Sequence, residues 1–177
     1  PKIVVFPEGA NFFKNLSVFL NPNEVKNFFE SAFPEPTLIV DNSRVIDENG
    51  EFKSRVIYLD SKTGALGFYD KKFLTPVGEF LPYHLKFVIN LFSKNKTSVF
   101  ANVREFSKGN SGPLIIETKN IRIGALVCSG ILSPGLYNKL SSLNPDFLIT
   151  MASAGIFKGA EDLLKQKVVA TNLILTG

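Results

Sequence analysis

The stretch IRIGALVCSG, at residues 121–130, decides how the rest of the chain is interpreted. A short apolar run that ends in turn residues is typical of a fully buried strand. The chain's single cysteine, Cys128, stands at the end of this run and is followed by Ser129 and Gly130. A cysteine at such a corner can be held with its sulfur facing a cleft, or it can be a small residue of the core. The other segments of the chain favour the first alternative.

Composition narrows the class of protein. The chain has 177 residues, of which 45% are hydrophobic and 20% charged, and this predicts one globular domain over residues 1–177. The net charge of +4 comes without a basic stripe of interleaved aromatic residues, so we expect no nucleic-acid partner. One cysteine and one histidine, His84, exclude a disulfide framework and a zinc site of the Cys/His type. No apolar run reaches the 18 residues of a membrane span, and we expect no metal or cofactor.

Apolar runs separated by turn signals predict a mixed domain. DENG, at residues 47–50, is a hairpin signal, and Asn21-Pro22 and Ser133-Pro134 are helix starts in which Asn21 and Ser133 are the candidate N-caps. Hairpins mixed with strand–helix–strand units predict an α/β (α+β) layered fold with helices packed on the strands. We expect further helices at residues 82–92 and 160–167, and strands at residues 2–6, 37–45, 52–59, 65–69, 113–117, 146–151 and 168–175.

Three charged or reactive residues follow three of these strands. Glu8 follows the first strand, Lys71 follows the strand at residues 65–69, and Cys128 ends its own strand. Ligands of α/β sheets bind at the carboxyl ends of strands, so we expect the three side chains to converge. A carboxylate can accept the proton that a thiol loses when it attacks, and a lysine can lower the pKa of the thiol and stabilise an oxyanion. Each residue alone could equally be a solvated loop residue or a packed one.

The same segments carry a family resemblance. FPEGA, at residues 6–10, resembles the (W/F)PE motif of the nitrilase (carbon-nitrogen hydrolase) superfamily, and YDKKFLTPVGEFLP, at residues 69–82, resembles its YxKxxLxPxGE motif. The form of the second motif is most like that of the bacterial apolipoprotein N-acyltransferases. GALVCSG, PDFLITMASAGIF and ATNLILTG are similar to the nucleophile strand and two later strands, so the resemblance covers nearly the whole chain.

The resemblance implies a role for each matching residue. Glu8 would be the general base, Lys71 the oxyanion stabiliser, and Cys128 the nucleophile that becomes a thioester. Glu79 would be the supporting carboxylate that faces the lysine, and the register of the motif favours Lys71 over its neighbour Lys72. The implied reaction moves an acyl chain from a phospholipid to the cysteine and then to the N-terminal amine of a lipoprotein.

The resemblance also implies an architecture and a location. The family fold is a four-layer α-β-β-α sandwich, and we expect this chain to be incomplete at both ends, as a fragment of a longer membrane-anchored parent. The catalytic domain would face the periplasm from the bacterial inner membrane, to which segments absent from this chain would tether it.

The sequence departs from the family pattern at three places. Ser129 and Gly130 replace an aromatic and an acidic residue after the cysteine, the run at residues 151–157 lacks the expected Asn-Asp-Ala-Trp-Phe, and no asparagine stands near Ser54. Three alternatives therefore stay open: the N-acyltransferase, a soluble nitrilase-type amidase that passes the acyl group to water, and a divergent domain that keeps the fold without catalysis.

Overall fold

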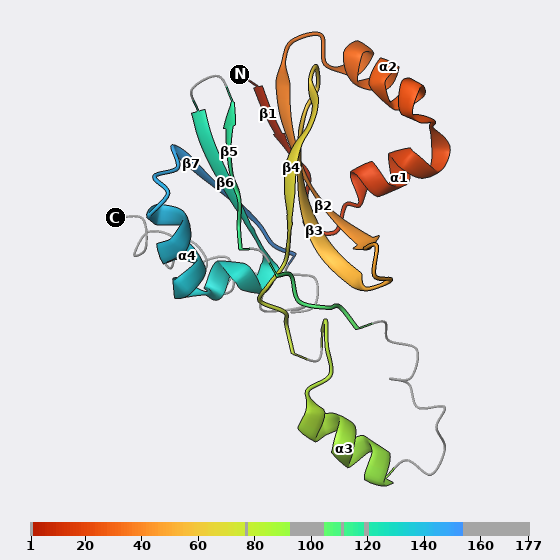
Figure 1. Ribbon diagram of the computed structural model, residues 1–177, viewed down its shortest axis with the longest axis vertical. Helices are drawn as coiled ribbons and strands as arrows, with labels where there is room; N and C mark the ends of the chain where they lie inside the picture. Colours follow the sequence, from red (N-terminus) through yellow and green to blue (C-terminus); the bar gives the residue numbers. More distant parts are fainter. Residues whose placement is uncertain (1, 77, 93–104, 111, 119–120, 154–177) are drawn as a thin grey trace.

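The computed structural model describes residues 2–76, 78–92, 105–110, 112–118 and 121–153, and two sheets form its centre (Figure 1). The first sheet has the order β1-β2-β3-β4, in which β1 is parallel to β2 and the other pairs are antiparallel. The second has the order β5-β6-β7, in which β7 is parallel to β6. The strand bounds are β1 Lys2–Val5, β2 Thr37–Ile46, β3 Phe52–Asp60, β4 Gly64–Asp70, β5 Ile115–Thr118, β6 Ile121–Val127 and β7 Phe147–Met151.

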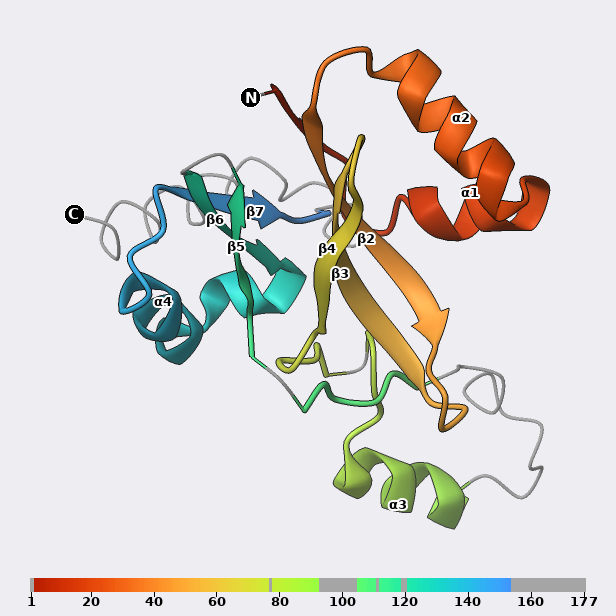
Figure 2. The same ribbon diagram turned by 45° about the horizontal axis from the view of Figure 1, so that its top comes forward.

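All but one of the α-helices in the described part of the chain lie on the outer faces of the two sheets, in both views of Figures 1 and 2. Phenylalanines of α1 (Phe12–Phe19) and α2 (Pro22–Ala32) pack together beside the first sheet. On the second sheet, α4 (Pro134–Ser141) buries Tyr137 and Leu140 against Leu126 of β6. The helix α3 (Tyr83–Phe92) projects away from both sheets. None of the helices among the described residues is long and apolar enough to cross a membrane.

The main core lies between the sheets. Buried residues of the first sheet form one cluster with buried residues of the second, and the cluster consists of Leu38, Val40, Val56, Tyr58, Tyr69, Ile116, Ile123, Ala125, Val127 and Met151. Side chains two apart on a strand share a face, so each sheet gives one face to this core and the other to its helices. The layers are therefore helix, sheet, sheet and helix.

Most of the predicted elements are present, with ends that differ by one or two residues. Asn21 begins α2 as predicted, and its side chain accepts hydrogen bonds from the Asn23 and Glu24 amides in a complete capping box. Ser133 is the N-cap of α4 and Pro134 its first residue, as predicted, although the Ser133 hydroxyl makes no capping hydrogen bond. The helix expected at residues 160–167 and the strand expected at residues 168–175 lie outside the described residues.

Helix α1 is an element that the sequence prediction omitted. It directly follows the loop after β1, and its N-cap Asn11 has left-handed backbone angles and makes no capping hydrogen bond. The usual start signal is therefore missing. What orders this helix is tertiary contact, because the Phe13 amide donates to the Asp41 carboxylate of β2 and Phe12 stacks on Phe6.

Candidate active site

Cys128 begins a sharp turn directly after β6. Val127 still has extended backbone angles, whereas Cys128 has a φ of 52° and starts the short 3₁₀ helix η1 (Cys128–Leu132). A left-handed conformation at a residue with a side chain costs about 1–3 kcal/mol and is held only where the surroundings impose it. The half-buried Cys128 thus stands at a strained backbone position, in the sharp turn that the sequence predicts after this strand.

Lys71 is the buried lysine of the loop that follows β4. Its amide donates to the Ser54 carbonyl at 2.8 Å, and only 2% of the residue is exposed. Its Nζ lies 2.6 Å from Glu79 Oε2, which also accepts the Thr75 amide at 2.7 Å. A buried ammonium needs such a partner, because an unpaired charge away from water is costly. The adjacent Lys72 is exposed, so the geometry brings Lys71 rather than Lys72 to the site.

Glu8 lies in the tight turn that follows β1. The Pro7 carbonyl accepts the Ala10 amide at 3.1 Å, and Gly9 within this turn has a φ of 71°. The Glu8 carboxylate accepts the Ser153 amide at 2.6 Å, and Ser153 comes just after β7 of the other sheet. The turn after β1 therefore meets the segment after β7, in the way that ligand sites form at the carboxyl ends of strands.

The charges of Lys71 and Glu8 both act on the Cys128 sulfur. Burial of the thiol raises its pKa most, the Lys71 ammonium lowers it, and the Glu8 carboxylate raises it through its charge and a hydrogen bond. The net direction is upward, so Cys128 holds its proton at neutral pH. Such a thiol needs a base in contact with it before it can attack, and Glu8 is placed to accept that proton.

Two contacts connect the lysine loop, which is the segment at residues 71–76 after β4, to the cysteine turn, which begins at Cys128. Neither contact was predicted from the sequence. Thr75 Oγ1 lies 3.8 Å from Cys128 Sγ, and the Ser129 hydroxyl donates to the Phe73 carbonyl at 2.5 Å. Ser129 is one of the departures from the family pattern, and in this structure it holds the loop segment at residues 71–76 against η1 through Phe73. In the sequence, the only signal that pointed to Ser129 was its presence where the family pattern has an aromatic residue.

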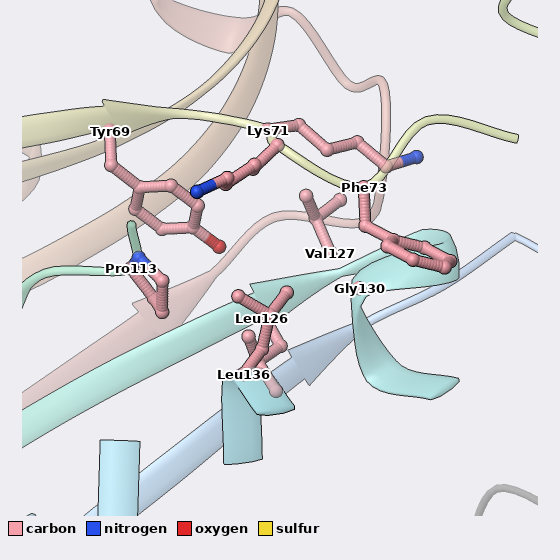
Figure 3. Close-up of a pocket in the computed structure, with 9 residues that line it drawn as sticks. Tyr69, Lys71, Phe73, Pro113, Leu126, Val127, Gly130 and Leu136 are labelled. Carbon is pink, nitrogen blue, oxygen red and sulfur yellow. The ribbon is translucent and has the colours of Figure 1, made fainter. Parts of the chain in front are cut away.

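A small apolar pocket lies beside the candidate site (Figure 3). It is bounded by the lysine loop on one side and by β6, η1 and α4 on the other. Tyr69 at its edge donates its hydroxyl to the Ala125 carbonyl at 2.7 Å, which fixes that ring. The lining residues are Tyr69, Lys71, Lys72, Phe73, Pro113, Leu126, Val127, Gly130 and Leu136. The pocket thus borders Lys71 and the cysteine turn without including Cys128 itself.

Gly109 is predicted to be essential for the placement of Lys71. Its amide donates to the Lys71 carbonyl at 3.0 Å, and a Cβ at this position would lie 2.1 Å from the Asp70 carbonyl oxygen. Because backbone atoms cannot move aside cheaply, Gly109→Ala should lower the free energy of unfolding in urea by about 1–3 kcal/mol.

The matched control for this prediction is Gly135→Ala. Gly135 lies in α4, and a Cβ there would meet no atom within 4 Å. Removing backbone freedom from the unfolded chain should then raise the free energy of unfolding by about 0.4–1 kcal/mol. Equal effects of the two substitutions would contradict the close approach at Gly109.

No family model and no curated protein sequence matches the chain. Solved structures do match it. An amidase from Nesterenkonia sp. has a TM-score of 0.54 at 12% identity, over 85% of this chain and 51% of that chain. A glutamine-dependent NAD+ synthetase from Acinetobacter baumannii has a TM-score of 0.53 at 22% identity, over 86% of this chain and 26% of that chain. A carbon-nitrogen hydrolase from Helicobacter pylori G27 has a TM-score of 0.51 at 18% identity, over 85% and 47%.

These likenesses show the fold. The amidase from Nesterenkonia sp. AN1 is described as a member of the nitrilase superfamily, and in one of its mutants acrylamide has added to the active-site cysteine. The chain shares the α-β-β-α arrangement of these proteins, which confirms the predicted fold class, and it spans between about a quarter and a half of their lengths. Among the described residues, no group of three or more His, Cys, Asp or Glu side chains could hold a metal ion.

Proposed function

We propose that the chain carries a cysteine-dependent acyl-transfer site in which Cys128 forms a thioester. The observation that carries this proposal is the convergence of one carboxylate and one buried ammonium on the chain's only thiol. A nitrilase-like fold supports it, because solved structures with this fold include amidases and a carbon-nitrogen hydrolase. The catalytic roles of Glu8, Lys71, Cys128 and Glu79 belong to this proposal.

The proposed reaction has two halves. Glu8 accepts the proton of the Cys128 thiol while the sulfur attacks the carbonyl carbon of the donor, and Lys71 stabilises the oxyanion that forms. The tetrahedral intermediate collapses to a thioester, and Glu8 returns the proton to the leaving group. The acceptor then attacks the thioester carbonyl and gives its proton to Glu8, and the cysteine leaves as the thiol. Glu79 holds Lys71 in place through the 2.6 Å hydrogen bond.

The substrate that we propose is an acyl chain of a phospholipid, transferred to the N-terminal amine of a lipoprotein. The form of the YDKKFLTPVGEFLP segment favours this apolipoprotein N-acyltransferase activity. Helix α3, which follows that segment, also favours it, because Tyr83, Phe87 and Leu91 are 90%, 69% and 67% exposed. These side chains are spaced by four residues and form one apolar stripe, as on helices that lie in a lipid surface. The proposal puts the domain on the periplasmic side of the inner membrane, tethered by segments outside this chain.

A nitrilase-type amidase is the second candidate. It is favoured by the solved amidase structures that share the fold, and it would use the same thioester with water as the acceptor. The two candidates use different donors, which are a phospholipid for the acyltransferase and an amide for the amidase. Only the acyltransferase needs an apolar surface that binds a lipid.

The test is to offer both donors to the full-length protein. One sample receives a phospholipid with a labelled acyl chain in detergent micelles, and the other receives a short aliphatic amide, with ammonia release as the readout. Hydroxylamine-sensitive label on the wild-type protein and none on Cys128→Ala would support the acyltransferase. Ammonia release without label would replace that assignment with the amidase. Neither signal from a folded protein would overturn the acyl-transfer proposal in favour of a non-catalytic domain.

A further inference from the structure

Asn42 is a buried amide that no part of the proposed reaction uses. It lies on β2, on the same face as Leu38 and Val40 of the core between the sheets, and is 2% exposed. A polar side chain in such a place is costly unless its hydrogen bonds are satisfied, and an apolar residue of similar size would pack there without that cost. The partners of this amide therefore indicate what it does.

The Asn42 side chain is hydrogen-bonded at both ends. Its Oδ1 accepts the amide of Gly9 at 3.0 Å, and its Nδ2 donates to Ser54 Oγ at 3.1 Å and to the Arg55 carbonyl at 3.2 Å. Its backbone carbonyl also accepts the Asn11 amide at 3.3 Å. The Asn42 side chain, on β2, thus joins the turn after β1 to Ser54 and Arg55 of β3.

Each end of this bridge adjoins a residue of the candidate site. Gly9 directly follows Glu8, and its left-handed φ makes the amide available to Asn42. Ser54, whose hydroxyl holds the Asn42 amide, also accepts the Lys71 amide on its carbonyl at 2.8 Å. The family resemblance predicts an asparagine near Ser54, and in the structure the side-chain amide of Asn42, on the neighbouring strand, donates to the hydroxyl of this serine.

We propose that Asn42 is a positioning residue that holds the turn carrying Glu8 so that its carboxylate contacts the Cys128 sulfur. The hydrogen bond from the Gly9 amide to Asn42 holds the turn in place. The bonds to Ser54 and Arg55 hold the side-chain amide of Asn42 that accepts this hydrogen bond. Without this amide, the turn loses its side-chain anchor at Gly9, while the backbone bond from Asn11 to the Asn42 carbonyl and the bond from the Ser153 amide to Glu8 remain. The catalytic consequence rests on the proposed function, but the placement of Glu8 does not.

The test measures the reactivity of Cys128 and needs no substrate. The chain has one cysteine, so the rate of iodoacetamide alkylation against pH reports the thiolate of Cys128 alone. The charged groups that act on this sulfur are Lys71, which is paired with Glu79, and Glu8. Glu8 opposes the thiolate, so Asn42→Ala should move the midpoint of the alkylation profile downward by roughly half a pH unit or more.

Two further variants separate positioning from a general loss of stability. Ser61→Ala is the matched control, because Ser61 is a buried residue just after β3 whose hydroxyl accepts the amide of Thr37, at the opposite end of β1 and β2 from Glu8. It should lower the unfolding temperature and leave the midpoint unchanged. In a Glu8→Gln background, Asn42→Ala should no longer move the midpoint. If Asn42→Ala does not fold, Asn42→Ser, whose hydroxyl is one bond too short to replace Oδ1, takes its place.

The outcomes decide between the two roles of Asn42. A downward shift that disappears in the Glu8→Gln background supports the positioning role, and acylation of Cys128, where it occurs, should then be about 100-fold slower. An unchanged or raised midpoint in a folded Asn42 variant overturns it and leaves Asn42 as a residue of the core. Failure of the acyl-transfer proposal would appear separately, as a wild-type protein that is alkylated normally but never acylated.

Discussion

Lys71→Met is expected to slow the acylation of Cys128 by about 100- to 1,000-fold, which is the usual cost of removing one donor to an oxyanion. The effect should be large because Lys71 is 2% exposed, so that its charge acts on the reaction with little screening by water. The rate is measured as the single-turnover appearance of hydroxylamine-sensitive label. Alkylation should shift as well, and its midpoint should rise, because Lys71 is the charge that lowers the pKa of the thiol.

Lys72→Met is the control for this variant. Lys72 is the neighbouring lysine of the same loop and is exposed, so its loss should change the acylation rate by less than about threefold. Similar losses in the two variants would contradict the assignment of Lys71 and point instead to the general charge of the loop.

The stability of the Lys71 variant needs a separate measurement. Removing the lysine leaves the Glu79 carboxylate, whose side chain is 12% exposed, with the Thr75 amide but without its ion-pair partner, which costs up to about 3–5 kcal/mol in the free energy of unfolding. The double variant Lys71→Met/Glu79→Gln removes both charges and should recover most of this loss. It should stay as slow in acylation as the single variant, which separates the oxyanion role from the folding role.

Glu8→Gln is expected to slow acylation by about 100- to 10,000-fold, as the loss of a general base. The amide cannot accept the thiol proton, but its oxygen can still accept the Ser153 amide that Glu8 holds at 2.6 Å, so the fold should persist. The alkylation midpoint should fall in this variant, because Glu8 raises the pKa of Cys128. Substitution of Glu8 should thus lower the alkylation midpoint and substitution of Lys71 should raise it, whereas both substitutions should slow acylation.

Glu117→Gln is the matched control for Glu8→Gln. Glu117 is an exposed carboxylate on β5, so Glu117→Gln should change neither the acylation rate nor the alkylation midpoint of Cys128 measurably. A Glu8→Gln variant that acylates at the wild-type rate, or whose alkylation midpoint rises, would show that Glu8 does not act on the sulfur as the structure indicates.

The strands and the candidate site could be predicted because both depend on short local patterns. Continuous apolar runs bounded by turns identified β1 and β6, the DENG hairpin signal lies between β2 and β3, and the three charged or reactive residues stand within three residues of the end of a strand. The carboxyl ends of such strands meet in a layered fold, so Glu8, Lys71 and Cys128 could be expected to converge before any distance was known.

The contacts that hold the site could not be predicted in the same way. The contact of Thr75 with Cys128 and the bond from Ser129 to Phe73 join residues more than 50 positions apart, and the bridge through Asn42 depends on the register of β2 against β3. Helix α1 was missed because its N-cap, Asn11, lacks a capping bond and the helix is ordered by contacts with β2. Each of these features is fixed by tertiary packing rather than by neighbours in the sequence.

The central claim is that Cys128 is a nucleophile activated by Glu8 and Lys71, and acylation by an activated ester tests it without assuming the natural donor. The protein would be mixed with p-nitrophenyl acetate, and the burst of nitrophenol and the intact mass would be followed together. We predict one acetyl group per chain, removed by hydroxylamine, absent from Cys128→Ala and strongly slowed in Glu8→Gln and Lys71→Met. A folded wild-type protein that gains no acetyl group, or that gains it equally in Cys128→Ala, would contradict the account.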